Sequence, residues 1–355
     1  MTEQALPTQA PRPGHGALGF RVQRWTPLSV GFTSGLSGLI ALLAFAPVLL
    51  SENTQTNLIQ LYFLVILAVM WNALAGYGGL VSIGQQAFIG LGAYAAVFFA
   101  VQHGLNPYTS MLLGTLVAGL VAIPVACVVL WLRNGAFAIA TWVIAEAFAI
   151  LVSLDPNPAI GGGTGTSEVL PFTFRYDPTQ RLHYTYWAAL GAVTVLLVLV
   201  FVLLRSRLGG SLQAIRDDEE AASAVGVRVL LGKGVLFIVA ALGCAAAGTV
   251  ILAWQLSIQP LGPDSIFGVN WTAKMIFMVL VGGLGTFEGP IIGAVLLYVL
   301  QIYVTTDGVW YFVMLGGIAI GFALLLPRGI WGTIQERFNV QLLPVGYRLR
   351  TGTGR

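Results

Sequence analysis

YTYWAALGAVTVLLVLVFVLL, residues 184–204, is a continuous apolar run without a single charged side chain. A helix needs about 20 apolar residues to cross the hydrocarbon core of a bilayer, so this run predicts a transmembrane helix. The rest of the chain has the same character, because 57% of its residues are hydrophobic and 9% are charged. A soluble domain carries about 25% charged residues. The composition therefore predicts an integral membrane protein with several spans.

Nine other apolar segments lie on the two sides of this run, which makes ten candidate spans. They cover roughly 29–50, 58–76, 84–101, 108–132, 135–153, 184–204, 234–256, 270–285, 289–304 and 309–326. The third, eighth and ninth are short or interrupted by glycine, as broken helices in transporters are. We therefore expect an all-α polytopic helical bundle of about 10 transmembrane helices, some broken or Gly-rich. This domain occupies 29–330, between a lead-in over 1–28 and a tail over 331–355.

Lysine and arginine residues indicate the orientation, because cytoplasmic loops are enriched in them. With the N-terminus inside, only Arg175 and Arg181 fall in an external loop, and Lys274 falls within a span. The basic residues inside are then Arg12, Arg21, Arg24, Arg133, Arg205, Arg207, Arg216, Arg228, Lys233, Arg328, Arg337, Arg348, Arg350 and Arg355. We predict that the N- and C-termini are both cytosolic and that no signal peptide is cleaved from the first 28 residues.

A charged segment, RSRLGGSLQAIRDDEEAASAVGV, follows the apolar run directly at 205–227. It cannot cross the membrane, since each central Asp or Arg costs about 2.5–3.5 kcal/mol. Its Ala, Leu, Gln and Glu residues favour a helix, which we predict over 211–225, ended by Gly226. The spacing places Leu212, Ile215, Ala222 and Val225 on one apolar face and predicts an Arg216–Glu220 pair on another.

The sequence contains no catalytic equipment that we recognise. The nearest approach to a phosphate-binding GxxxxGK[ST] loop is Gly232-Lys233-Gly234, but Val227 stands where the first glycine should be. Any ATP hydrolysis must therefore take place on another chain. The three histidines are scattered, so no metal-ligand spacing exists. Cys127 and Cys244 lie in apolar runs, where we expect free buried thiols rather than a disulfide or a redox pair. We expect no cofactor and no bound metal.

Polar residues at membrane depth are candidates for a substrate pathway. Ser82, Gln85 and Gln86 follow several glycines, and a broken helix there could turn backbone N–H groups toward a carboxylate. Glu146 lies in the middle of a span, where it could contact substrate or pair with Lys274. Helix–helix hydrogen bonding is the alternative for the glutamines. Glu288 falls at a predicted cytosolic turn, where we expect it to be solvated.

Two glycine-rich segments echo each other weakly. GGLVSIGQQAFIG at 78–90 is similar to GGLGTFEGPIIG at 282–293. Both precede a helix rich in small residues, as in transporter folds built from repeated halves. Two glycine-rich segments can also resemble each other by chance.

Residues 220–226, EAASAVG, match the EAA-x-x-x-G element of ABC importer permeases. With WNALAGYGGLVSIGQQAFIGLGAYAA (71–96) and WTAKMIFMVLVGGLGTFEGPIIGA (271–294), the 205–227 segment resembles the branched-chain amino acid permease family of LivM type. The Leu-Pro that follows the element in many other ABC permeases is absent, and the charge of Lys274 departs from the expected pattern. The resemblance implies an ATPase-coupling segment formed by Arg216, Asp217, Glu219, Glu220, Ala221, Ala222 and Gly226.

The same resemblance implies the partners and the location. We expect two ABC ATPase subunits that bind the ATP, a second homologous permease subunit, an external substrate-binding protein and the lipid of a bacterial inner membrane, with no nucleic acid. The implied substrates are branched-chain or related amino acids. Two alternatives stay open: a permease for urea or short amides, and an ion-coupled secondary transporter that uses Glu146 as its ion site.

Overall fold

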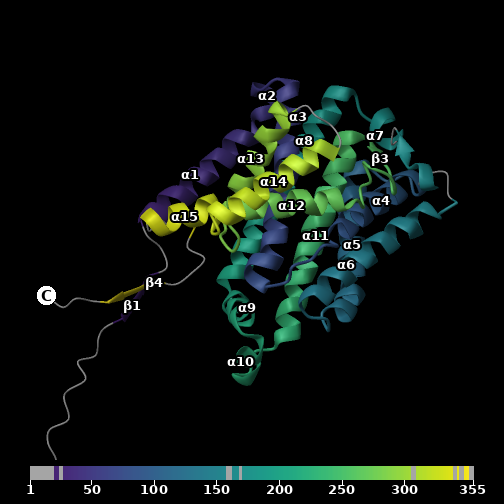
Figure 1. Ribbon diagram of the computed structural model, residues 1–355. Helices are drawn as coiled ribbons and strands as arrows, with labels where there is room; N and C mark the ends of the chain where they lie inside the picture. The colour runs from purple at the N-terminus through teal and green to yellow at the C-terminus, as the bar shows by residue number, and fades with distance from the viewer. Residues whose placement is uncertain are drawn as a thin grey trace, which may run out of the picture.

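Helices make up nearly all of the computed structural model (Figure 1). The structure describes residues 20–23, 27–156, 162–167, 170–304, 309–338, 342–343 and 348–351. Within these ranges, six helices are long and apolar enough to cross a membrane, and four shorter apolar helices accompany them. Together they match the ten predicted segments. The prediction of an all-α polytopic bundle is confirmed.

The ten apolar helices and the short elements between them follow the predicted order. The helices are α1 (Pro27–Ala44), α2 (Ala46–Leu49), α3 (Glu52–Asn72), α4 (Gln86–Gln102), α5 (Pro107–Val129), α6 (Asn134–Ser153), α7 (Leu170–Phe174), α8 (Pro178–Arg205), α9 (Arg207–Asp217), α10 (Glu219–Ala224), α11 (Val229–Gln255), α12 (Val269–Gly282), α13 (Gly289–Tyr303), α14 (Val309–Leu325) and α15 (Gly329–Phe338). Two short antiparallel pairs join β1 (Phe20–Gln23) to β4 (Arg348–Thr351) and β2 (Thr166–Ser167) to β3 (Ser257–Ile258).

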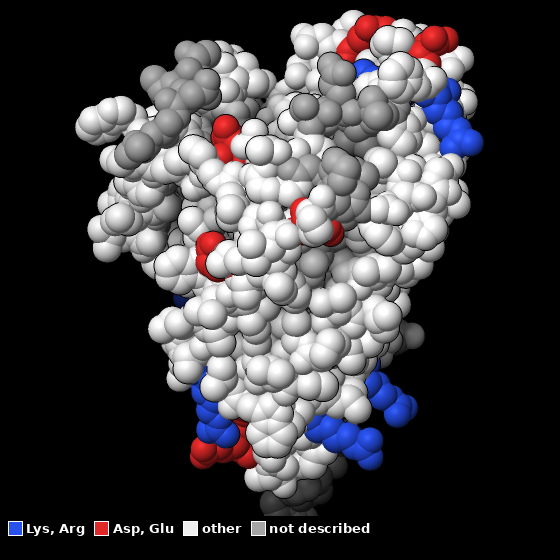
Figure 2. Space-filling model, turned by 90° about the vertical axis from the view of Figure 1, so that its right-hand side faces the viewer, with Lys and Arg blue, Asp and Glu red and all other residues white. Residues whose placement is uncertain are grey.

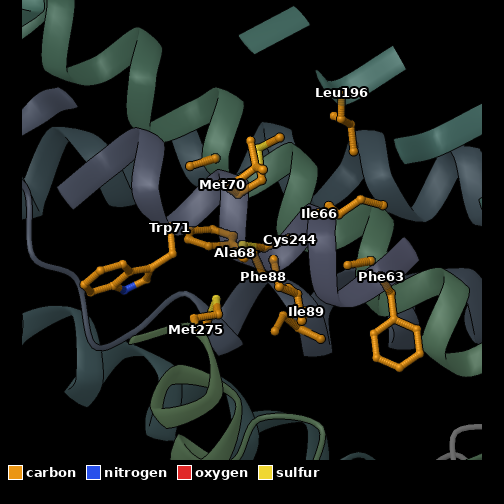
Figure 3. Close-up of a cluster of buried hydrophobic side chains, with 14 of the residues drawn as sticks. Phe63, Ile66, Ala68, Met70, Trp71, Phe88, Ile89, Leu196, Cys244 and Met275 are labelled. Carbon is orange, nitrogen blue, oxygen red and sulfur yellow. The ribbon is translucent and has the colours of Figure 1, made fainter. Parts of the chain in front are cut away.

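Helices α3 and α11 form the centre of the bundle, and small residues let their neighbours approach closely. A Cβ atom on Gly248 would lie 2.0 Å from the carbonyl oxygen of Ile89 in α4, and one on Gly243 would lie 2.3 Å from Sδ of Met70 in α3. Figure 3 shows Met70, Phe88 and Ile89 among the side chains that gather around this contact. Close backbone approach at small residues is how helices associate without a hydrophobic driving force between them.

The outer helices present apolar side chains to the surroundings. Only 22% of the most apolar part of α6 is buried inside the protein, compared with 83% for the helix that spans Glu52–Tyr77. Figure 2 shows charged atoms at the lower end of one face and scattered acidic atoms over its upper half, with a largely uncharged band in the lower middle. This distribution fits a protein whose middle is surrounded by lipid. Both cysteines are free thiols as predicted, but only Cys244 is buried; the prediction of a buried thiol is wrong for Cys127, which is exposed on the outer side of α5.

Two of the apolar helices are interrupted at the predicted glycine-rich places. Helix α3 continues into a π-helical turn, Ala73–Tyr77, and the chain then runs without helix until α4 begins at Gln86. Helix α12 ends at Gly282, and a turn over 283–288 leads into α13. We refer to 73–85 as the first break and to 283–288 as the second break. The start of the first break and the second break both lie beside α9, and the first break then continues to the first turn of α12, where Thr272 donates a hydrogen bond to the Ile83 carbonyl.

Candidate functional site

The charged segment forms two helices rather than the single helix predicted over 211–225. The backbone of Asp218 is extended, with φ −156° and ψ 109°, so α9 ends there and α10 begins. Oδ1 of Asp218 accepts hydrogen bonds from the backbone N–H groups of Glu220 and Ala221, both at 3.0 Å. Aspartate is a preferred N-cap residue because its carboxylate satisfies the first free N–H groups of a helix. The prediction of one continuous helix was therefore wrong.

The predicted apolar face is present for three of its four members. Leu212, Ile215 and Ala222 are buried, so α9 and α10 rest on the underside of the membrane domain. Val225 is 81% exposed, because it is the C-cap of α10 and has left the helical repeat. Gly226 has φ +88° and ends α10 as predicted, with its N–H bonded to the Ser223 carbonyl and that of Val227 to Ala222.

The acids of the segment fall into an anchored and an exposed group. Glu219 forms an ion pair with Lys233 of α11 at 2.6 Å, and the Lys233 side chain is only 10% exposed. Glu220 lies 3.7 Å from Arg133, where both side chains are largely exposed. Its predicted pairing with Arg216 is wrong, because the break at Asp218 removes the i,i+4 register. Glu219 thus fastens α10 to α11, while Glu220 and Asp217 face outward.

Arg216 reaches the first break with one side of its guanidinium group, while 40% of its side chain stays exposed. Its Nη1 donates a hydrogen bond to the carbonyl oxygen of Gly76, 2.9 Å away in the first break. Its Nε and Nη2 donate to Asp217 at 3.1 and 3.0 Å. A Cβ atom on Gly285 would lie 3.4 Å from Nη1 of Arg216, so the second break is also in contact with this side chain. One arginine of α9 therefore touches both breaks.

Asn72, the last residue of α3, connects the first break to the second by two hydrogen bonds. Its Nδ2 donates to the carbonyl oxygen of Thr286, and its Oδ1 accepts from the backbone N–H of Gly285, both at 2.8 Å. A Cβ atom on Gly76 would lie 2.4 Å from Oδ1 of Asn72 and 2.6 Å from the backbone nitrogen of Gly285. The sequence indicated a weak similarity between the two glycine-rich segments. It did not indicate that Asn72 and Arg216 contact both of them.

Three predicted pathway residues lie together where the first break leads into α4. Ser82, Gln85 and Gln86 are fully buried. Oγ of Ser82 accepts from the Gly84 N–H and from Nε2 of Gln85. Oε1 of Gln86 accepts from Oγ1 of Thr272 in α12. Among the described residues, Oε1 of Gln85 and Nε2 of Gln86 have no hydrogen-bond partner.

Glu146 lies apart from these residues and does not pair with Lys274. It is exposed on α6, where its carboxylate accepts a hydrogen bond from Nε1 of Trp142 at 3.1 Å. It lines a small cavity of about 210 Å³ with the 260–270 segment. Nζ of Lys274 instead lies 4.6 Å from the ring centre of Trp271. The predicted pairing is wrong, because Glu146 is bonded to Trp142 and faces the first residues of α12 across this cavity, while Lys274 lies one turn further along α12 over Trp271.

Glu288 is not the solvated residue that we expected. Its two carboxylate oxygens accept hydrogen bonds from the Leu343 N–H at 2.8 Å and from Nε1 of Trp331 at 3.1 Å. Burial raises the pKa of Glu288 above its ordinary value, and these hydrogen bonds partly oppose the shift. Glu288 thus ties the second break to α15 and to the chain beyond it.

Comparison with known proteins gives one family and several relatives. A model of the "Branched-chain amino acid transport system / permease component" family matches residues 53–324. The LivM permeases of the high-affinity branched-chain amino acid transport systems of Escherichia coli and Salmonella typhimurium are each 27% identical over 82% of this chain and 74% of their own. The ribose import permease RbsC of Bacillus subtilis is 28% identical over 50% of this chain and 54% of its own.

The matched region runs from the start of α3 to the end of α14, so it contains both breaks, the α9–α10 segment and the three buried residues before α4. The catalytic chemistry of an ABC transporter belongs to its ATPase subunits, which agrees with the failed match to a phosphate-binding loop in this chain. This chain belongs to the permease component family of the branched-chain amino acid ABC transport systems.

Proposed function

We propose that this chain forms half of the transmembrane pathway of an importer for branched-chain amino acids. In this proposal a second homologous permease subunit forms the other half of the pathway. Two ABC ATPase subunits bind on the cytosolic side, and a substrate-binding protein delivers the amino acid from outside the membrane. The protein lies in a bacterial inner membrane with both termini in the cytosol, because that orientation places most basic residues inside.

The way α9 and α10 are attached carries this proposal. Their inner side is fixed by the Glu219–Lys233 ion pair and by the hydrogen bond from Arg216 to Gly76. Their outer side presents Asp217 and Glu220, whose side chains are 70% and 86% exposed. An element that is rigidly tied to the membrane domain on one side and free on the other is suited to receive a partner. We infer that the ATPase binds this outer side.

The link from α9 to the two breaks supports a route for the coupling. A displacement of α9 by the ATPase would move the Arg216 guanidinium, and with it the turns at Gly76 and Gly285. These turns position the N-terminal ends of α4 and α13. Opposed movements of packed helices about such breaks are the usual form of alternating access.

We propose that Ser82, Gln85 and Gln86 face the substrate during this movement. Two buried amide atoms without a hydrogen-bond partner, Oε1 of Gln85 and Nε2 of Gln86, support this role. A buried polar atom that lacks a hydrogen bond costs about 1–3 kcal/mol. A ligand or water that passes the start of α4 could satisfy them. Glu146 would lie beside the route at the outer side, where its cavity meets the 260–270 segment.

Two observations favour amino acids over sugars or urea as the substrate. The similarity to the LivM permeases extends over 82% of the chain, whereas that to the ribose permease covers half of it. The family matched is itself that of the branched-chain amino acid systems. The transport experiment must therefore include a sugar and a short amide as comparison substrates.

Reconstituted transport tests the proposal. The complete complex, in proteoliposomes with ATP inside for the ATPase, should take up leucine when the binding protein is present outside. Ribose and urea serve as comparison substrates, and a proton ionophore should leave leucine uptake unchanged. Uptake that needs no ATP and collapses with the ionophore would contradict the proposal, as would faster uptake of ribose or urea than of leucine.

A further inference from the structure

A second and larger cavity lies among the central helices, away from the first break. Its volume is about 450 Å³, and it is bordered by α3, α11, α12, α13, α14 and the segment before α12. Pockets for small organic ligands span about 300–1,000 Å³, so this one suits a small ligand. The residues that matter for its chemistry are Phe63, Trp254, Asp264, Trp271 and Lys274.

Lys274 brings an unsatisfied ammonium group to this cavity. The residue is half-buried, and its Nζ atom lies 4.6 Å from the ring centre of Trp271. Among the hydrogen bonds and ion pairs of the described residues, none involves its Nζ atom. A half-buried ammonium without an acceptor is costly, because part of its hydration is lost and no hydrogen bond replaces it. The cavity leaves room for an anionic group to supply the missing acceptor.

Asp264 provides the opposite charge at the same cavity. Asp264 and Lys274 both line the cavity, yet the two side chains do not form an ion pair in the described structure. A positive and a negative group therefore face one cavity with space between them. A neutral ligand such as a sugar or urea could hydrogen-bond to these groups but would offer neither of them an opposite charge.

Aromatic rings form the apolar wall beside these charges. The ring centres of Phe63 and Trp254 are 5.6 Å apart, and those of Phe63 and Trp271 are 6.2 Å apart. Such a wall gains free energy from contact with an apolar side chain. The cavity thus combines a cation, an anion and an apolar surface, which are the three features needed to recognise an apolar α-amino acid.

We propose that this cavity binds a zwitterionic amino acid with an apolar side chain. Lys274 holds the α-carboxylate, Asp264 holds the α-ammonium, and the rings of Phe63, Trp254 and Trp271 contact the side chain. The inference rests on the proposed amino-acid transport and adds a binding site within a single permease subunit. It also gives a role to the one charge that departs from the pattern expected of the family.

Protection of Lys274 from acetylation tests the site directly. The chain has two lysines, Lys233 and Lys274, so Lys233 is an internal control in the same molecule. The complete complex in lipid nanodiscs, without ATP, is treated with a small acetylating reagent, and both sites are quantified by mass spectrometry. Leucine at ten times its Kd should slow acetylation of Lys274 about tenfold, by occupancy of the site. The rate at Lys233 should not change.

Two leucine analogues separate the contributions of the two charges. Isopentylamine lacks the carboxylate and should not protect Lys274, and 4-methylpentanoate lacks the ammonium and should protect much less than leucine. Asp264→Asn should abolish the difference between leucine and 4-methylpentanoate. Asp177→Asn is the matched control, because Asp177 begins α8 and is not part of the cavity wall.

The outcomes distinguish this site from the transport function. If Lys274 is acetylated equally fast with and without leucine in a complex that transports leucine with ATP, the site is wrong and the transport function stands. Protection by 4-methylpentanoate as strong as that by leucine would overturn the role of Asp264 and leave a general carboxylate site. A complex that does not transport leucine would reject the amino-acid function, and the ligand assigned to the cavity with it.

Discussion

Nη1 of Arg216 donates a hydrogen bond to the carbonyl oxygen of Gly76, 2.9 Å away, so a side chain of α9 closes the π-helical turn that ends α3. Gly76 in turn packs against Asn72 and Gly285, where no Cβ atom would fit. The charged segment and the two breaks therefore form one connected unit. A single guanidinium group contacts both breaks, which is the basis of the coupling route that we propose.

Arg216→Ala should uncouple ATP hydrolysis from transport. The substitution removes the bond to Gly76, and the loss in stability should be about 1 kcal/mol because the side chain is 40% exposed. The complex should assemble normally, yet ATP-driven leucine uptake should fall at least about tenfold, equivalent to about 1.4 kcal/mol of lost coupling. Arg207→Ala is the control, since Arg207 is an exposed residue of the same helix. Equal uptake by the two variants would contradict this role of Arg216.

Glu219→Gln should loosen α10 more than Lys233→Met does. The first change leaves the Lys233 ammonium nearly buried without its partner, whereas the second leaves a carboxylate that is 32% exposed and can be hydrated. We expect a cost of about 1–3 kcal/mol for Glu219→Gln and less for Lys233→Met, after allowance for that exposure. Limited proteolysis between α9 and α11 measures the loosening. If Lys233→Met is cleaved faster than Glu219→Gln, the ion pair does not hold α10 in this way.

Gly226→Val should misdirect the chain that leaves α10. The φ angle of +88° is unfavourable for a side chain, and nothing lies within 4 Å of a Cβ atom there, so the cost is backbone strain of about 1–2 kcal/mol or more. The variant should reach the membrane in normal amount but lose ATPase binding. Gly210→Ala is the matched control, because it also has open space around it and lies within α9. ATPase binding should survive in that control; loss in both variants would point to general misfolding.

Cytosolic termini are the next prediction, which rests on the distribution of basic residues. Reporter domains fused to either end should read as cytosolic, and a small tag placed between α6 and α8 should be accessible from outside. The loop tag and the terminal fusions report on opposite sides, so each controls for the other. An external reading at either terminus would reject the topology.

The sequence predicted the spans well because the length and apolarity of a segment are local properties. It failed where side chains outside the local pattern decide the structure. The continuous helix over 211–225 was wrong because the carboxylate of Asp218 captures two backbone N–H groups and starts a new helix. The Lys274–Glu146 pair was wrong because span membership does not show which faces of α6 and α12 meet. The resemblance implies a coupling role for Arg216, which stays a prediction, but its hydrogen bond to Gly76 could not be predicted because Gly76 is 140 residues away in the chain.

The most direct measurement of the central claim, that the α9–α10 segment binds the ATPase, uses Glu220→Lys. Glu220 is 86% exposed and its contact with Arg133 is long, so the change should cost less than about 1 kcal/mol of stability. The variant permease, purified in nanodiscs, is titrated with its ATPase partner beside the unmodified protein, and ATP-driven leucine uptake is measured on the same preparations. We predict normal membrane insertion, ATPase affinity reduced at least about tenfold, equivalent to about 1.4 kcal/mol, and uptake lost in proportion. Unchanged affinity and unchanged uptake would contradict the claim.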